Sequence, residues 1–351
     1  MRSESLLQKV SITNDGVILL GNTLACDGFD RRCLIGAISH AHQDHTQGLY
    51  SSLHSYNPII VSPPTRRLLI ASEGRWLERR SNLVELPVRK PFRYKDEQIV
   101  FYPATHILGS VKILLKQADG TRILYTGDFR MPQRPPQTDV LVIEATYGDP
   151  KHIRRFGKEF PQSQLVRLVK QKIGIGPIQI HSTQGKLQEV MRLLRKQNVQ
   201  APFLMPKKVY AWSLVYKQYG KDLGECFPVE SQEAEEIQRS KNGYILFFTI
   251  GSKMLNFNKY FCLKISGREP WIPFQKIAEN YYSVTISDHA DLSELLTFIE
   301  RSGAKLVITD GSRCGASLKL ADEVKRRLKK DAYSMPSQGP TSNRRTQSPQ
   351  K

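Results

Sequence analysis

The sequence predicts a mixed α/β fold in which sheets have helices outside, and two observations along the chain lead to this prediction. The first 150 residues contain many short β-type runs bounded by turns and few helical patterns, which is typical of a sandwich of sheets. After residue 150, strand and helix patterns alternate, which indicates a parallel sheet. The Ser-, Gln-, Pro- and Arg-rich end of the chain, 333–351, is predicted to be disordered.

The predicted elements follow from apolar runs and from helical spacing. In the first part, apolar or alternating runs between turn residues predict strands at 15–21, 23–28, 35–42, 59–62, 82–87, 98–104, 111–117, 122–127 and 140–146. A helix is expected over 64–74. Further along, strands are expected at 178–181, 203–206, 244–250, 282–287 and 305–309, and helices within 151–173 and at 186–197, 212–219, 291–302 and 317–328.

Composition narrows the class of protein. The chain has 40% hydrophobic and 24% charged residues, as a soluble globular protein does, and no apolar run reaches the ~20 residues of a membrane span. Its 52 Lys and Arg residues against 33 acidic residues give a net charge of +19, which attracts polyanions and nucleic acid first of all. The five cysteines form no Cys-x-x-Cys pair, so we expect free thiols in a reducing cytoplasm. The N-terminal residues Met-Arg-Ser-Glu-Ser lead into a short mixed segment that does not resemble a signal peptide.

The segment from Ser39 to Gly48 predicts a metal site. It runs Ser-His-Ala-His-Gln-Asp-His-Thr-Gln-Gly, and imidazole and carboxylate are the ligands that zinc prefers. At the end of a strand His40 and His42 point the same way because side chains alternate. Asp44 and His45, in the turn that follows, can then face a second ion. The alternative, a solvated polar loop with unconnected histidines, is disfavoured by this density of ligands.

Two further fragments complete a ligand set for a two-metal site. His106 follows a predicted strand in Tyr-Pro-Ala-Thr-His-Ile-Leu-Gly-Ser, and Asp128 follows another in Leu-Tyr-Thr-Gly-Asp-Phe-Arg. Each is weak evidence alone, because a histidine after a strand is often a surface residue and Gly-Asp is a common turn. Together with the first segment they supply a third histidine for one ion and a carboxylate that bridges two.

These motifs resemble those of the metallo-β-lactamase superfamily, whose signature is His-x-His-x-Asp-His, then a later His, then a later Asp. The resemblance spans roughly residues 10–147 and 280–330. It implies an αββα sandwich. Asp27 stands where the family has an early aspartate at a strand end, which supports the ligands from outside the metal's contact distance.

Within that superfamily the motifs look most like those of the β-CASP nucleases, a branch that includes RNase J, the messenger-RNA 3′-end endonuclease, Artemis-type DNA nucleases and ligase-associated exonucleases. Glu144 matches the branch's acid after the bridging aspartate, and His289 matches its later Ser-x-His. At the third position RNA-acting members usually have histidine and Artemis-type members valine, whereas this chain has Asp310. The resemblance implies a first sandwich part at 1–150, an inserted β-CASP-like α/β cap at 151–274 and a return to the sandwich at 275–332.

The resemblance also implies a role for each residue. His40, His42 and His106 would hold one zinc ion; Asp44, His45 and Asp310 would hold a second; and Asp128 would bridge them, with manganese as the other metal to consider. The expected catalytic residues are His289, Glu144 and Asp44. His289, oriented by Glu144, would protonate the leaving oxygen of a phosphodiester.

The expected partner is single-stranded RNA or DNA, and the expected activity is that of a zinc-dependent nuclease. Four residues of the cap are expected to contact the nucleic acid: Ser182, Lys186, Lys207 and Lys208. Two other functions remain open: a small-molecule hydrolase of the same fold, such as a thioesterase or lactonase, and a nucleic-acid-binding protein with a weakened metal site. The sequence also leaves open RNA or DNA, endonucleolytic or 5′-exonucleolytic cleavage, and the oligomeric state.

Overall fold

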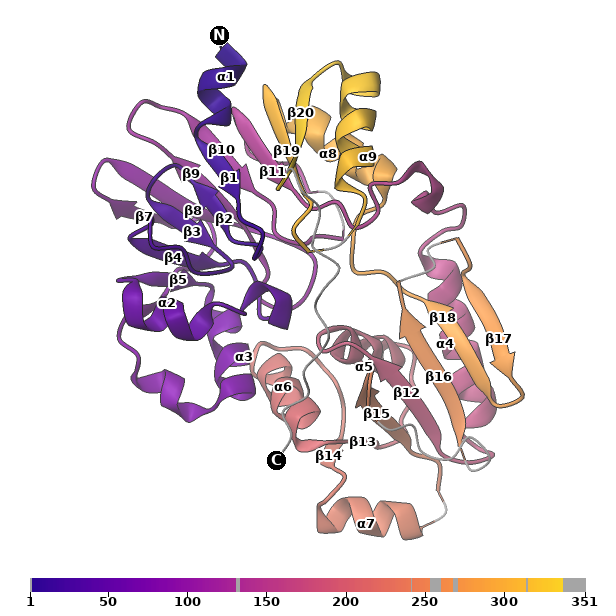
Figure 1. Ribbon diagram of the computed structural model, residues 1–351. Helices are drawn as coiled ribbons and strands as arrows, with labels where there is room; N and C mark the ends of the chain where they lie inside the picture. Colours follow the sequence, from indigo (N-terminus) through magenta and orange to yellow (C-terminus); the bar gives the residue numbers. More distant parts are fainter. Residues whose placement is uncertain are drawn as a thin grey trace.

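The computed structural model describes residues 2–130, 133–240, 242–252, 260–267, 271–313 and 315–336, and these residues form a mixed α/β fold with three sheets (Figure 1). The first sheet has the strand order of the sequence: β1 (Val10–Ile12), β2 (Ile18–Leu20), β3 (Leu24–Cys26), β4 (Ile35–Ile38), β5 (Ile59–Val61) and β6 (Leu83–Glu85). The second sheet has the order β20-β19-β11-β10-β9-β8-β7, with β7 (Pro91–Tyr94), β8 (Glu97–Pro103), β9 (Val111–Lys116), β10 (Arg122–Tyr125), β11 (Val140–Ile143), β19 (Leu306–Asp310) and β20 (Asp331–Met335).

The first two sheets pack face to face, as alternation along β11 illustrates. Val140 and Val142 join the core between the sheets, whereas Leu141 and Ile143 face the opposite side, where α8 (Leu292–Ser302) and α9 (Ser317–Glu323) pack. Both faces are buried, so the strand is apolar throughout. Each such side chain contributes roughly 1.5–3 kcal/mol by leaving water.

The outer face of the first sheet is covered by α2 (Leu49–Ser55) and α3 (Pro63–Glu73). Together with α8 and α9 beyond the second sheet, these helices complete the order helix, sheet, sheet, helix. The prediction of sheets with helices outside is therefore confirmed, and the layering is consistent with a metallo-β-lactamase-like fold. A short helix, α1 (Arg2–Leu7), precedes β1.

The third sheet is formed by a segment of the chain that lies between β11 and β19 of the second sheet. Its order is β14-β13-β15-β12-β16-β18-β17, and all pairs are parallel except β17 with β18. The strands are β12 (Ile178–Ser182), β13 (Phe203–Met205), β14 (Cys226–Pro228), β15 (Ile245–Thr249), β16 (Phe261–Ser266), β17 (Phe274–Ala278) and β18 (Tyr281–Thr285). Its helices are α4 (Glu159–Lys172), α5 (Lys186–Lys196), α6 (Lys207–Gln218) and α7 (Gln232–Arg239).

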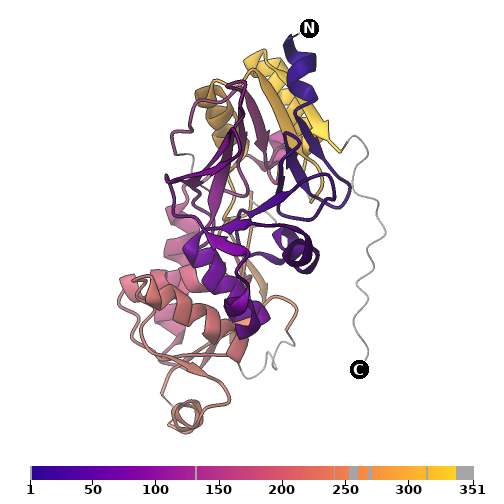
Figure 2. The same ribbon diagram turned by 90° about the vertical axis from the view of Figure 1, so that its left-hand side faces the viewer.

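The third sheet and its helices pack against the sandwich through α3 and α6, which lie side by side in Figures 1 and 2. The indole N–H of Trp212 in α6 donates to the Ser72 hydroxyl in α3 at 2.8 Å. Gly185, before α5, has a φ of +83°, and a Cβ there would lie 2.2 Å from Ile107 Cγ2. Glycine therefore allows this loop to approach the segment that carries His106.

Several boundaries differ from the sequence prediction. Strand β4 ends at Ile38, so His40 and His42 lie in the loop beyond it. The boundary predicted at 274/275 falls at the start of β17, and the third sheet continues to Thr285 because β18 pairs with β16. Residues 333–335 belong to β20, so the prediction of disorder there is wrong; residues 337–351 lie outside the described residues. Within the described chain, no helix is long and apolar enough to span a membrane.

Candidate metal centre

The predicted ligands come together because several strands end at the same edge of the sandwich. In the second sheet β10, β11 and β19 are mutually parallel, and β8 has the same direction because β9 is antiparallel to both β8 and β10. The loops that leave these strands carry His106 and Asp128, and His40 and His42 follow β4 of the first sheet. Gly127 has a φ of +52°, and a Cβ on it would lie 2.9 Å from the Ser39 Cβ. Glycine at 127 therefore lets the Asp128 loop reach the histidine loop.

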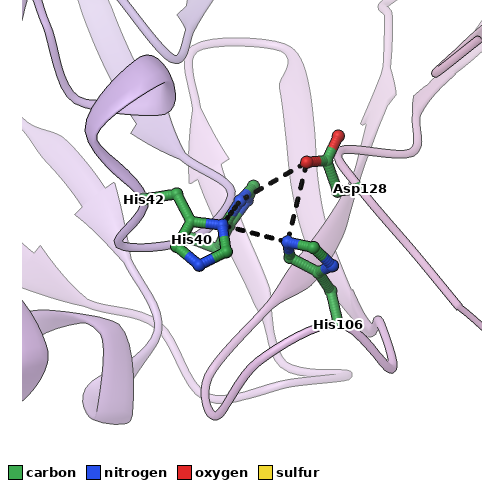
Figure 3. Close-up of side chains that lie close together, drawn as sticks. All are labelled: His40, His42, His106 and Asp128. Atoms are coloured by element: carbon green, nitrogen blue, oxygen red, sulfur yellow. Dashed lines mark hydrogen bonds and ion pairs between the residues drawn. The ribbon is translucent and has the colours of Figure 1, made fainter. Parts of the chain in front are cut away.

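Four side chains gather their ligand atoms within 4.8 Å of one another: His40, His42, His106 and Asp128 (Figure 3). The Nδ1 of His42 lies 3.2 Å from His40 Nε2 and 3.0 Å from His106 Nε2. Asp128 Oδ2 lies 3.7 Å from His40 Nε2 and 3.6 Å from His106 Nε2. Ligands at about 2.0–2.1 Å around a tetrahedral zinc lie roughly 3.3 Å apart, so the donor set has the size of a zinc site.

The hydrogen bonds of the three rings show which nitrogen of each ring is unprotonated and turns its lone pair toward the centre. His106 Nδ1 lies 3.0 Å from the Asp288 carbonyl and His42 Nε2 lies 3.0 Å from the Gln184 carbonyl; a carbonyl only accepts, so these nitrogens carry the protons. The Ser39 hydroxyl donates to Asp27, so it accepts from Nδ1 of His40. Each ring therefore turns a lone pair toward the other two and toward Asp128. Such an arrangement is repulsive unless a cation lies between the lone pairs.

Burial also favours the neutral imidazoles that metal binding requires. It lowers the pKa of His106 to about 3, against the attraction of Asp128. Burial and the neighbouring histidines hold the pKa of His40 well below its ordinary value. The residues present thus fit a metal ion at this position, both in donor chemistry and in spacing.

His45 is held by a different partner. Its Nδ1 lies 2.8 Å from Asp27 Oδ2, and its buried Nε2 has no hydrogen-bond partner, with Asp128 Oδ2 at 3.4 Å and Asp44 Oδ2 at 3.6 Å. Burial opposes protonation, but Asp128 and Asp27 raise the pKa of His45 to about 10. In the described chain, the group of four ligands around His42 does not include His45, Asp44 or Asp310.

The predicted pair of His289 and Glu144 is formed beside the ligands. His289 Nδ1 lies 2.8 Å from Glu144 Oε2 and 4.0 Å from Asp128 Oδ2, while Glu144 Oε1 accepts from the Phe129 N–H at 2.8 Å. Burial opposes the charged ring, but Glu144 and Asp128 raise the pKa of His289 to about 9. The pair can therefore keep a proton on an imidazole next to the metal ligands.

Asp310 lies in the same region, but its carboxylate already accepts hydrogen bonds from other groups of the protein. Its Oδ1 accepts from the Ser312 N–H at 2.8 Å and from the Ser312 hydroxyl at 2.5 Å, and its Oδ2 accepts from Arg313 Nη1 at 2.7 Å. Arg313 is not among the residues that the sequence predicts for the site. No motif marks it, because its role depends on a side chain that turns back from the loop after β19.

Two adjoining cavities open onto these residues. The inner cavity, about 180 Å³, is lined by His42, Asp44, Asp128, Glu144, His289 and Arg313, among others. The outer cleft, about 420 Å³, shares His42, Asp44 and Thr183 with it and is also lined by Lys208 and Trp212. The outer cleft thus lies between the metal ligands and the helices of the third sheet.

The four residues predicted to contact nucleic acid differ in how accessible they are to a ligand. Lys208 lines the outer cleft and Lys207 is exposed. Lys186 is buried and forms an ion pair with Asp288 at 3.1 Å. Ser182 is fully buried and its hydroxyl donates to the Ile265 carbonyl, so it has no surface to offer a ligand.

The chain was compared with family models, curated proteins and solved structures, and no family model matches it. It is 32% identical over 129 residues to an uncharacterized protein in the lig 3′ region of Acidianus ambivalens, covering 36% of this chain and 91% of that protein. It is 26% identical to the probable RNase MJ4 of Methanocaldococcus jannaschii, covering 61% of this chain and 60% of that one, and 34% identical to the 5′ exonuclease Apollo of Gallus gallus, covering 41% and 32%. The chain thus spans less than two thirds of the length of either of these two nucleases.

A solved structure shares the fold. A protein of unknown function from Enterococcus faecalis V583 superposes with a TM-score of 0.55 at 17% identity, and the match covers 78% of this chain and 75% of that one. At this identity the match supports the architecture alone.

The ligand geometry predicts that His106 is needed for metal binding. His106→Ala should weaken zinc binding by more than about 10-fold, a loss seen even when a group that merely orients a ligand is removed. Zinc retained per chain after dialysis against a graded chelator measures this. His54→Ala, which changes an exposed histidine on α2, is the matched control and should retain zinc. Equal retention by both variants would contradict the proposed ligand set.

Proposed function

Because the chain belongs to the β-CASP branch of the metallo-β-lactamase superfamily, a family of metal-dependent hydrolases, we propose that it is a nuclease that hydrolyses phosphodiester bonds of single-stranded nucleic acid. The relatives named as an RNase and as a 5′ exonuclease support this class of substrate. The net charge of +19 supports it independently, because a field of that sign concentrates polyanions.

The observation that carries the proposal is the pairing of His289 with Glu144 beside the metal ligands. Phosphodiester hydrolysis expels an alkoxide, which is a poor leaving group unless it receives a proton. His289 carries a proton that Glu144 stabilises, and its Nδ1 lies 4.0 Å from the Asp128 carboxylate. We therefore assign His289 as the general acid and Glu144 as the residue that positions it.

The proposed metal at His40, His42, His106 and Asp128 is zinc. Three imidazoles and one carboxylate suit zinc better than manganese, which prefers oxygen ligands. Bound there, zinc would supply a Lewis acid and a source of hydroxide near neutral pH. The protein's own contribution is to hold three lone pairs and Asp128 in place and to keep His289 protonated.

We further infer that the third sheet with α4, α5, α6 and α7 forms a β-CASP-type cap and that the strand of nucleic acid passes through the outer cleft. Lys208 lines this cleft, and the exposed Lys207 precedes it at the start of α6. Lys186 lines the inner cavity, where its ammonium is already paired with Asp288. Ser182 is left out of the proposed path because it is fully buried. The cytoplasmic location suggested by the thiols stays a prediction.

Cleavage of end-labelled oligonucleotides tests the proposed function. The zinc-loaded protein should cleave single-stranded RNA or DNA, and His289→Ala should lower kcat by about 10²- to 10⁴-fold, the usual contribution of a general acid. His54→Ala should cleave at the rate of the unchanged protein. Labels at the 5′ and 3′ ends of the same strand distinguish exonucleolytic from endonucleolytic cleavage.

Each other function would give a different result in that experiment. No cleavage of either nucleic acid, together with hydrolysis of a thioester or lactone, would indicate a small-molecule hydrolase. Binding of oligonucleotides without bound zinc and without cleavage would indicate a binding protein.

The pairing of His289 with Glu144 predicts the pH dependence of cleavage. A general acid must be protonated, so kcat should fall as the pH rises through the pKa of His289, which Glu144 raises. Glu144→Gln removes the opposing charge, and such a partner shifts a pKa by roughly 1–3 units, so the falling limb should move to lower pH. Glu159→Gln, an exposed residue, should leave the limb in place. An unmoved limb in Glu144→Gln would contradict the assignment.

Salt dependence tests the path through the outer cleft. The double variant Lys207→Ala/Lys208→Ala should bind a single-stranded oligonucleotide more weakly and reduce the slope of log K against log salt by about 0.7 per lost phosphate contact. The matched control, Lys95→Ala/Lys116→Ala, changes exposed lysines next to β7, β8 and β9. If both double variants show the slope of the unchanged protein, the proposed path is wrong.

A further inference from the structure

The loop that follows β19 places a cation beside residues that the sequence predicts to hold a second metal ion. That ion would be held by Asp44, His45 and Asp310, with Asp128 shared between the two metals. In the structure, both carboxylate oxygens of Asp310 accept hydrogen bonds from the protein: Oδ1 from Ser312, and Oδ2 from Arg313. To bind a metal, Asp310 would have to give up this ion pair with Arg313.

The guanidinium of Arg313 is fixed in place by acceptors from several segments. Besides Asp310, its Nη2 donates to the Gly16 carbonyl at 2.9 Å and its Nε donates to the Asp44 carbonyl at 3.4 Å. Only 11% of the side chain is exposed. Because a guanidinium presents its N–H groups in a rigid planar fork, acceptors in three directions determine its position.

This fixed charge lies among the carboxylates that a second ion would need. Arg313 lines the inner cavity together with Asp44 and Asp128. Its Nη2 lies 4.0 Å from Asp27 Oδ2, the atom that also holds His45. Arginine stays protonated at any pH that the protein encounters, so the positive charge is permanent.

The remaining donors do not fit a second divalent ion well. Without Asp310, the second position has Asp44, His45 and the shared Asp128. A divalent ion there would also lie beside a buried guanidinium, and like charges repel strongly where water is excluded. The first position, by contrast, keeps its four donors.

We propose that this chain binds a single metal ion, at His40, His42, His106 and Asp128, and that the guanidinium of Arg313 supplies the positive charge that a second ion would otherwise bring. The inference deepens the proposed function, since it concerns the same site. Arg313 is a positioning residue: it holds Asp310 away from the metal and balances the negative charge of Asp27 and Asp310. The two-metal prediction and the role of Asp310 as a ligand are thereby replaced.

Zinc counting on the full chain tests the proposal. The protein is saturated with zinc, desalted and analysed by mass spectrometry of the metal. The unchanged protein should hold about one zinc ion per chain, and Arg313→Ala should hold about two, because Asp310 is freed and the repulsive charge is gone. Arg313→Lys keeps a charge and should stay near one. Arg326→Ala, which removes an exposed arginine paired with Glu323, is the matched control and should also stay near one.

Two outcomes would overturn the proposal. One is about two zinc ions in the unchanged protein, and the other is a count near one in a folded Arg313→Ala, with folding checked by circular dichroism. If Arg313→Ala does not fold, the zinc counts of Asp310→Asn and of the unchanged protein are compared instead. A count near one in both proteins supports the proposal. A count of two in the unchanged protein that falls to one in Asp310→Asn overturns it. The count does not depend on cleavage, so a chain that holds two ions and cleaves RNA or DNA contradicts only this inference. One ion without cleavage contradicts only the proposed function.

Discussion

The rest of the site depends on the hydrogen bonds that the buried carboxylate of Asp27 accepts. Its oxygens accept from the N–H and hydroxyl of Ser39 at 2.6 Å, from Nδ1 of His45 at 2.8 Å and from the hydroxyl of Tyr125 at 2.8 Å. Ser39 follows β4 of the first sheet and Tyr125 ends β10 of the second, so one anion joins the two sheets at the edge where the ligands meet. Burial works to raise its pKa, but His45 and Arg313 hold the pKa of Asp27 below its ordinary value. A buried charge persists only with partners of this kind.

The metal centre is completed by parts of the chain outside the sandwich. The carbonyl of Gln184, in the loop after β12, fixes the ring of His42, and the carbonyl of Asp288, after β18, fixes the ring of His106. These two carbonyls decide which ring nitrogens are free to face a metal. The third sheet therefore does more than border the outer cleft. Its loops hold the rings of His42 and His106 in the orientation that a metal ion at this position would require.

The negative charge of Asp310 and the positive charge of Arg313 balance each other. A substitution at only one of the two positions would remove this balance. An aspartate in place of histidine adds a negative charge to a region that already contains Asp27, Asp44 and Asp128. The guanidinium of Arg313 compensates for that charge and is held by backbone carbonyls of two distant loops. A lysine there would carry the charge without the rigid fork that reaches Asp310 and these carbonyls at once.

The sequence by itself determined the mixed α/β class and four predicted ligands whose donor atoms come together, because strand and helix periodicity is local and the order of His40, His42, His106 and Asp128 is a motif. It also identified His289 and Glu144, although 145 positions separate them in the chain. Only the tertiary structure decided that Arg313 turns back onto Asp310, that Ser182 is buried beside the neighbouring strand β16, and that the third sheet extends to Thr285. Each of these depends on which distant backbone a side chain or strand meets. That choice follows from packing of the whole chain, which no local pattern records.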